Sequence, residues 1–190
     1  MDILDVIRAR RTIGKSSGEI PHDVVLELIE AATWAPNHKL TQPWRFTVID
    51  GPARERLGRV WATRAADAIE PAARAAFIEG ESAKLLRAPT LIVVSSRTDA
   101  NPVTAEEDFA ATAAAVQNLL LVAHAKGLGA AWKTGKMVYD AGVKAFLNLD
   151  PADRIVAVVY LGAAALEEAV PRERDTRNCV HWISERVVPA

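Results

Sequence analysis

The stretch Gln-Pro-Trp-Arg-Phe at residues 42–46 lies between a predicted helix and a predicted strand. Alternation over residues 45–50 indicates the strand, which an Asp-Gly-Pro turn ends. Before the stretch, Pro21 suits the first turn of a helix, and Pro36 ends that helix near residue 35. Aromatic side chains in such a stretch more often pack in a core than contact a cofactor. Its meaning therefore depends on the rest of the chain.

The rest of the chain mixes helices and strands in an irregular order. The regular crossovers of a doubly wound sheet are too few, so we predict an α+β fold with a sheet flanked by helices. Residues 1–190 are expected to form one domain with an irregular C-terminal extension from about residue 163. Helices are predicted over residues 2–10, 21–35, 53–84 (split at Pro71), 105–126 and 140–147, and strands over 45–50, 90–95, 130–134 and 154–161.

Composition narrows the class of protein. Across 190 residues the formal net charge is −1, which provides no broad electrostatic footprint for nucleic acid or for an anionic membrane surface. The longest apolar stretch, residues 109–125, is interrupted by Gln117 and Asn118, so we expect a buried helix and no membrane span. The single cysteine, Cys179, and the absence of a signal-like start favour the reducing cytoplasm.

Several common catalytic motifs are missing. Gly14-Lys15-Ser16 resembles the end of a phosphate-binding loop, but position 9 is alanine and no strand precedes it. Gly127-Leu128-Gly129 follows a helix and leads into a strand, the reverse of the order in dinucleotide folds. The four histidines lack metal-ligand spacing, and no nucleophile elbow is present. We therefore predict no metal site and no hydrolase.

Three separated segments carry the chemical signal. They are Arg10-Arg11-Thr12, the region from Ala35 to Lys39 together with residues 42–46, and Ala131-Trp132-Lys133-Thr134-Gly135. Each is weak alone, because an arginine pair often only caps a helix and a lysine near a strand end is often merely exposed. Their order, with a long apolar helix and Gly-x-Gly between the last two, is more specific.

In that order the chain resembles the nitroreductase family over about residues 2–162, particularly its small bacterial YdjA-like branch. The family has a short helix ending in Arg-Arg-Ser, a Gln-Pro-Trp-x-Phe block, a long central helix and a Trp-Arg/Lys-Ser/Thr-Gly strand end. The resemblance implies a mixed, mostly antiparallel sheet with the long helix at a dimer interface. It also implies a homodimer with a non-covalent FMN at each of two sites shared between the subunits.

The resemblance also implies roles for individual residues. Arg10, Lys133 and the Gly135 amide suit the flavin phosphate, because a dianion needs cations and N–H donors. Thr12 and Thr134 suit ribityl hydroxyls or phosphate oxygens. Arg11 is expected near the N1–C2=O edge, where positive charge stabilises the anionic reduced flavin.

Other residues are expected beside the flavin ring. Pro36, Asn37 and His38 of one subunit would approach the ring held by the other subunit. Trp34 joins that wall or simply packs in the interface, and Trp132 is expected beside the cofactor. The chain departs from the family at Gly14, where a basic residue is usual, with Lys15 displaced by one position. His124 and Lys126 are weak candidates for meeting the nicotinamide donor, because a helix C-terminus also favours such residues.

The implied reaction is a ping-pong transfer of hydride from NADH or NADPH, through the flavin, to a nitroaromatic, quinone or related acceptor. The flavin carries the chemistry, so no side chain is expected to act as a catalytic nucleophile or acid–base group. The alternatives are a specialised flavin enzyme of the same fold, such as a dehalogenase or a flavin-consuming enzyme, and a flavin-binding protein with little turnover.

Overall fold

A four-stranded antiparallel sheet forms the centre of the computed structural model, which describes residues 2–163 and 172–183. The strand order is β1-β2-β4-β3, and every pairing between these strands is antiparallel. This confirms the mostly antiparallel sheet expected from the sequence. The strands are β1 (Trp44–Ile49), β2 (Thr90–Ser96), β3 (Leu128–Lys133) and β4 (Arg154–Ala163).

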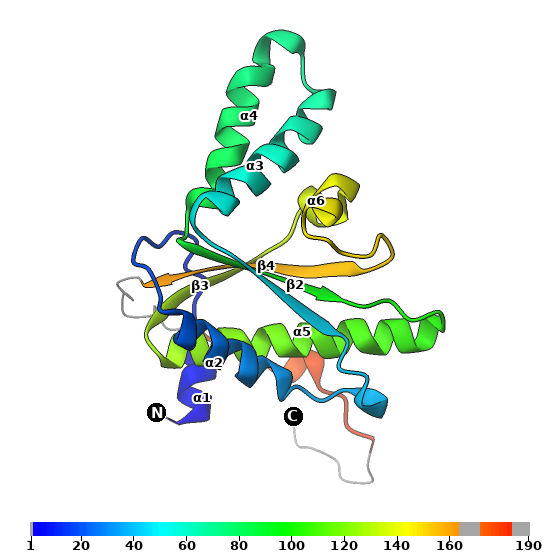
Figure 1. Ribbon diagram of the computed structural model, residues 1–190. Coiled ribbons are helices and arrows are strands. Elements are labelled where there is room, and N and C mark those ends of the chain that lie inside the picture. Colours follow the sequence, from blue (N-terminus) through cyan, green and yellow to red (C-terminus); the bar gives the residue numbers. More distant parts are fainter. Residues whose placement is uncertain (1, 164–171, 184–190) are drawn as a thin grey trace.

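Helices cover both faces of the sheet (Figure 1). Below it in that view lie α1 (Ile3–Ala9), α2 (His22–Thr33) and the long α5 (Pro102–Ala125). Above it lie α3 (Gly51–Ala65), α4 (Arg74–Ala83) and the short α6 (Ala141–Phe146). Each layer has its own apolar core, so the central strands β2 and β4 are buried on both faces, as their continuous apolar runs predicted.

Local signals in the sequence set the boundaries of the helices. The Asn101 side chain accepts hydrogen bonds from the amides of Val103 and Thr104, and Pro102 occupies the first turn. As a result α5 begins three residues earlier than its apolar pattern alone predicted. Pro71 separates α3 from α4, as expected, and Asp140 caps α6 by accepting from the Val143 amide.

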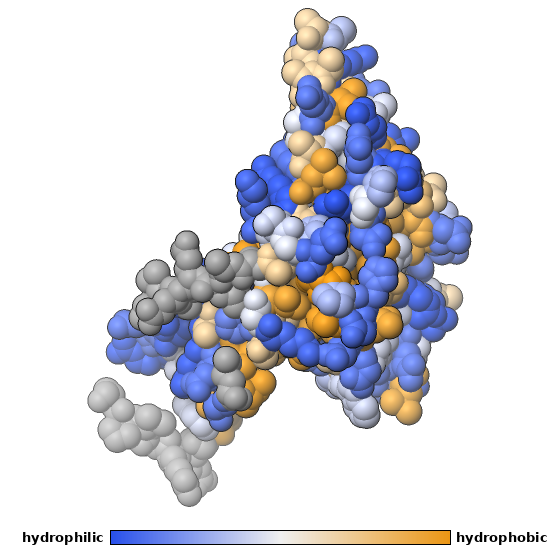
Figure 2. All heavy atoms as spheres, turned by 60° about the vertical axis from the view of Figure 1, so that its left-hand side comes forward, coloured by the Kyte–Doolittle hydropathy of each residue, from blue (hydrophilic) through white to orange (hydrophobic). Residues whose placement is uncertain are grey.

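The helices α3 and α4 form a hairpin that rises from the body of the molecule (Figures 1 and 2). Close packing joins them, because a Cβ on Gly58 would stand only 2.8 Å from the carbonyl oxygen of Ser82. On the face shown in Figure 2, apolar side chains are scattered among charged ones on both the hairpin and the body. The base of this hairpin contributes to the pocket described below.

Most of the apolar surface of α5 is already covered within one chain. Val116, Leu119, Leu120 and Ala123 are buried, and Phe109 packs against the same core. The family resemblance implies that this helix lies at a dimer interface. The accessible side of α5 is in fact narrow and includes Glu107, Ala110 and Gln117.

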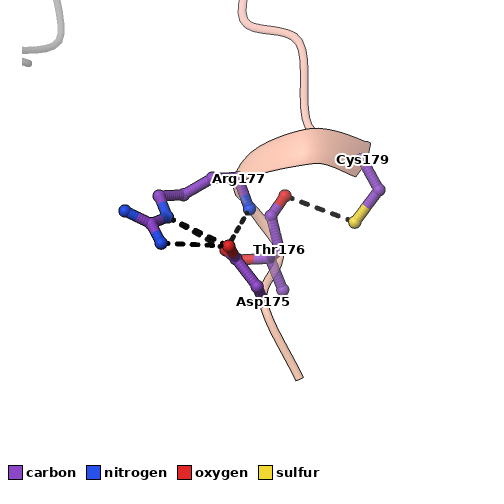
Figure 3. Close-up of polar contacts among 4 residues, drawn as sticks. All are labelled: Asp175, Thr176, Arg177 and Cys179. Atoms are coloured by element: carbon purple, nitrogen blue, oxygen red, sulfur yellow. Dashed lines mark hydrogen bonds and ion pairs between the residues drawn. The ribbon is translucent and has the colours of Figure 1, made fainter. Parts of the chain in front are cut away.

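The described part of the C-terminal extension, residues 172–183, contains one 3₁₀ turn, η6 (Arg177–Cys179). Asp175 holds this turn by pairing with the Arg177 guanidinium at 3.0 Å and accepting from its amide (Figure 3). The exposed Cys179 thiol donates to the Thr176 carbonyl oxygen over 3.2 Å. The irregular extension expected from about residue 163 stays a prediction, because residues 164–171 and 184–190 lie outside the described ranges.

Candidate functional site

A pocket opens where β3 ends beside the base of the α3–α4 hairpin. It consists of an inner chamber of about 320 Å³ and an adjoining outer chamber of about 670 Å³. Gly14, Arg87 and Lys133 line both chambers. We call the two chambers together the basic pocket, because five basic residues and one acidic residue line it: Lys15, Lys84, Arg87, Lys133, Lys136 and Glu81.

The loop after α1 forms one wall of the basic pocket. Its backbone is fixed at several points, since Ile13 donates to the Ala130 carbonyl oxygen at 2.9 Å and Ser16 donates to that of Arg87 at 2.8 Å. Gly162 on β4 permits this close approach, because a Cβ there would collide with Ser16 and Pro89. The loop therefore holds Gly14 and Lys15 against the end of the sheet.

The end of β3 forms a second wall. Lys133 and Thr134 are exposed, and Gly135 has φ +115°, a backbone conformation that favours glycine. The 3₁₀ turn η5 (Lys136–Tyr139) follows, and Arg64 of α3 holds its far end through an ion pair of 2.7 Å to Asp140. The Asp140 pKa is lowered: burial alone would raise it, but hydrogen bonds from Arg64 and backbone amides outweigh burial. This wall is thus tied to the hairpin.

Unpaired positive charge dominates the basic pocket. Lys84 pairs with Glu81, whereas the described residues offer no ion pair to Lys15, Arg87, Lys133 or Lys136. The buried side of the pocket is largely apolar and includes Leu85 and Met137. Exposed cations around an apolar floor suit a ligand that has both an anionic group and an apolar part.

The floor of the inner chamber also carries a phenol. Tyr160 of β4 is only 7% exposed and lines the chamber together with Trp61, Leu85 and Met137. Burial raises the pKa of the Tyr160 phenol; nearby Arg87 opposes this shift and Glu81 adds to it. The hydroxyl is therefore protonated at neutral pH.

A second group of expected site residues lies elsewhere in the chain. Pro36, Asn37 and His38 line an open groove against α5, together with Glu107 and three alanines, Ala110, Ala111 and Ala114. His38 Nδ1 lies 2.8 Å from Glu107 Oε2, and Asn37 Oδ1 accepts from the Gln42 amide at 3.0 Å. Trp34 is 77% exposed, and its indole N–H donates to Glu30.

These two groups lie at opposite edges of the sheet. Residues 36–38 precede β1, whereas residues 133–135 end β3, and β1 and β3 are the two edge strands. Three strand spacings separate the edges by roughly 14 Å. The structure of one chain therefore does not bring the two groups together in one pocket.

The arginines at the end of α1 form a third group. Arg10 ends α1 through its amide, which donates to the Val6 carbonyl oxygen, and the Arg11 guanidinium donates to the carbonyl oxygens of Arg8 and Arg10. The pKa of nearby His124 is lowered, first by burial and then by these two arginines. Arg10, Arg11 and the exposed Thr12 do not line the basic pocket. They lie on the segment that leads to Gly14 in its wall.

Trp132, which was expected at the site, does not line the basic pocket. Trp132 is half-buried and donates its indole N–H to the Val156 carbonyl oxygen at 3.1 Å, so its expected place beside a cofactor stays a prediction. The pocket also contains residues that the motifs did not indicate, because no local pattern marks a chain that returns to the site through tertiary packing. They are Trp61, Glu81, Lys84, Leu85, Arg87, Lys136, Met137 and Tyr160.

Within the described ranges, no cluster of three or more histidine, cysteine, aspartate or glutamate side chains is arranged to hold a metal ion. None of the helices in those ranges has the length and apolar character needed to span a membrane.

An antiparallel sheet with helices on both faces and a basic pocket at the end of an edge strand defines an α+β protein with a site whose charge suits an anionic ligand. Comparison with known proteins identifies the family of this chain. Residues 7–163 match the Nitroreductase family, and the chain belongs to this family.

Curated relatives and solved structures agree with this assignment. The chain is 34% identical over 160 residues to the "Putative NAD(P)H nitroreductase YfhC" of Bacillus subtilis, which covers 83% of this chain and 82% of the relative. It is 30% identical to YdjA of Escherichia coli over 88% and 91% of the two chains, in agreement with the expected branch. A Nitroreductase-like Family Protein from Bacillus cereus has a TM-score of 0.85 at 29% identity, with 96% of each chain covered.

One further solved structure contains a ligand. It is a "putative nitroreductase in complex with FMN" from Desulfovibrio desulfuricans, with a TM-score of 0.70 at 27% identity and 98% of both chains covered.

Proposed function

We propose that this chain is one subunit of a homodimeric, FMN-dependent oxidoreductase that transfers hydride from NADH or NADPH to a nitroaromatic, quinone or related acceptor. The observation that carries the proposal is the basic pocket of a nitroreductase-family fold, with unpaired cations around an apolar floor. The FMN-bound relative from Desulfovibrio desulfuricans and the nitroreductase names of the bacterial relatives support it. A cytoplasmic location is part of the same proposal.

The residues of the pocket fit FMN. Its phosphate is a dianion, and the proposed contacts are Lys133 and the Gly135 amide in the pocket and Arg10 on the segment that leads to Gly14. Lys15, Arg87 and Lys136 add positive potential. The flat ring system suits the floor made by Leu85, Met137 and Trp61. No dinucleotide-binding fingerprint is available for the adenylate half of FAD, so FMN is favoured.

The chain's own residues would bind and orient. Flavin held there would supply the hydride chemistry of the proposed ping-pong reaction between the nicotinamide donor and the acceptor. The cations of the pocket favour the negatively charged reduced form of the cofactor. Arg11 at the N1–C2=O edge, and Thr12 and Thr134 on the ribityl chain or phosphate, are proposed to fix its position. We assign no side chain as nucleophile or acid–base catalyst.

The subunits are proposed to share each site. Pro36, Asn37 and His38, with Trp34 nearby, would then reach the flavin that the other subunit holds through Lys133 and Gly135. The separation of these groups across the sheet supports this arrangement, because a two-fold axis can bring residues of one chain to the pocket of the other.

The proposal can be tested in three steps. The purified protein should be yellow or become yellow with FMN, and mass spectrometry should identify FMN as the cofactor released on denaturation. Only FAD, or no flavin after reconstitution, would contradict it. Anaerobic addition of NADH or NADPH should then bleach the bound flavin, which separates an enzyme from a protein that only binds flavin. Product analysis with a nitroarene, a quinone and a halogenated phenol would identify the acceptor class.

A further inference from the structure

Tyr160 is a buried polar residue to which the family comparison assigns no task. It lies within β4, opposite Leu91 of β2 and Ala131 of β3, and faces the layer of α3, α4 and α6. Because Ala131 has only a methyl group, the phenol ring has room beside it. Tyr160 is only 7% exposed, and it lines the floor of the inner chamber.

The hydroxyl of Tyr160 lacks a hydrogen-bond partner within the described residues. The hydroxyl is nevertheless open to the chamber. In the described ranges, the Ser82 hydroxyl is the only side-chain polar atom that is both fully enclosed and without a partner, so the unpaired Tyr160 hydroxyl is not fully enclosed. Buried polar groups in folded proteins are nearly always hydrogen-bonded, to protein, water or ligand. A phenol that the protein leaves unpaired on a pocket floor is therefore suited to a ligand.

The surroundings of Tyr160 define what it can bind. Arg87 and Glu81 are the charged groups close enough to influence it, and burial keeps the phenol neutral, so it acts as a hydrogen-bond donor. Its other neighbours in the chamber, Trp61, Leu85 and Met137, are apolar. The unpaired lysines, by contrast, are exposed at the rim, where a dianionic phosphate is better stabilised than at the apolar floor.

We propose that Tyr160 donates a hydrogen bond to an acceptor atom of the flavin ring and so recognises the ring rather than the phosphate. This inference rests on the proposed function. It makes Tyr160 a cofactor-recognition residue, with no role in proton transfer.

The substitution Tyr160→Phe removes only the hydroxyl. Flavin affinity is measured by fluorescence titration of the apoprotein with FMN and with riboflavin, which lacks the phosphate. We expect the Kd to rise about 2- to 12-fold, the range for one net hydrogen bond, by the same factor for both flavins. The melting temperature of the apoprotein should stay the same or rise, because the hydroxyl has no protein partner to lose. The matched control is Tyr139→Phe, since Tyr139 is 83% exposed in the neighbouring turn and should change neither quantity.

Three results would overturn the role of Tyr160: unchanged affinity for both flavins, loss of affinity for FMN alone, or a destabilised apoprotein. The second would place the hydroxyl at the phosphate, and the third would make it a structural group. Failure of the wild-type chain to bind either flavin would overturn the proposed function and this role with it. Normal flavin binding by the Tyr160→Phe variant would overturn only the role of Tyr160.

Discussion

Replacing Lys133 with alanine should weaken FMN binding by about 1.5 kcal/mol, or roughly tenfold in Kd. A hydrogen bond to a charged group contributes about 1.5–3 kcal/mol, and the lower end applies because Lys133 is exposed and water screens its charge. Arg87 and Lys15 line the same chamber and would retain part of the positive potential. The Lys133 side chain has no ion pair or hydrogen bond among the described residues, so its removal should leave the stability of the apoprotein nearly unchanged.

The assay is fluorescence titration of apoprotein with FMN at low and high salt, because an electrostatic contact should weaken as salt rises. The matched control is Arg56→Ala, which removes an equally exposed positive charge from α3 outside the pocket. Arg10→Ala should also weaken binding if the proposed phosphate site is correct. An unchanged Kd in both the Lys133 and the Arg10 variants would refute the reasoning and place the phosphate elsewhere.

Ala110→Arg, on the exposed side of α5, should convert the dimer into a monomer, measured by light scattering, and weaken FMN binding, measured by titration. The control variant Ala76→Arg, on the exposed surface of α4, should change neither property. An Ala110→Arg variant that stays dimeric and yellow would contradict the shared site. Gly135 has a positive φ, so Gly135→Ala should lower the free energy of unfolding in urea by about 1 kcal/mol. Gly80 lies within α4 with free space around it, so the control variant Gly80→Ala should stabilise the protein. Equal effects of the two substitutions would contradict the backbone argument. The pKa of His124 is lower in the folded protein than in the unfolded chain, so the unfolded chain is protonated first and the folded state loses stability as the pH falls below about 6.5. The variant His124→Gln should therefore lose less stability between pH 7.5 and 5.5. A pH profile of stability identical to that of the wild type would contradict this argument.

The elements of the fold could be predicted because their signals are local. The apolar runs at residues 90–95 and 154–161 indicated strands buried on both faces, and Pro71 marked the break between α3 and α4. The start of α5 was predicted three residues late because the cap at Asn101 lies outside the apolar pattern. The purely antiparallel pairing of the described strands could not be read from the runs themselves, since parallel and antiparallel strands can both be continuous and apolar.

The site was only partly predictable for a related reason. Lys133, Thr134 and Gly135 belong to one segment with a motif, and the structure places all three at the pocket. Arg87 and Tyr160 carry no such pattern: Arg87 precedes β2, and Tyr160 resembles any other core residue of a buried strand. Arg87 reaches the pocket because the chain returns from the α3–α4 hairpin to the sheet. Tyr160 is of interest because its hydroxyl lacks a protein partner. Neither feature can be seen in a sequence.

The position of the pocket and the open groove beside α5 together favour the proposed symmetric dimer over a site completed within one chain. Most apolar side chains of α5 are satisfied by the chain's own core, so burial of this helix alone does not require a partner. The open groove beside α5 is different, because it is lined by alanines and by residues 36–38, and Trp34 and Leu40 remain 77% and 79% exposed near it in the sequence. Exposed apolar groups around a shallow groove are typical of a surface that a second chain covers. If that chain is an identical copy, each pocket gains the groove residues of the other subunit, so assembly and cofactor binding strengthen each other.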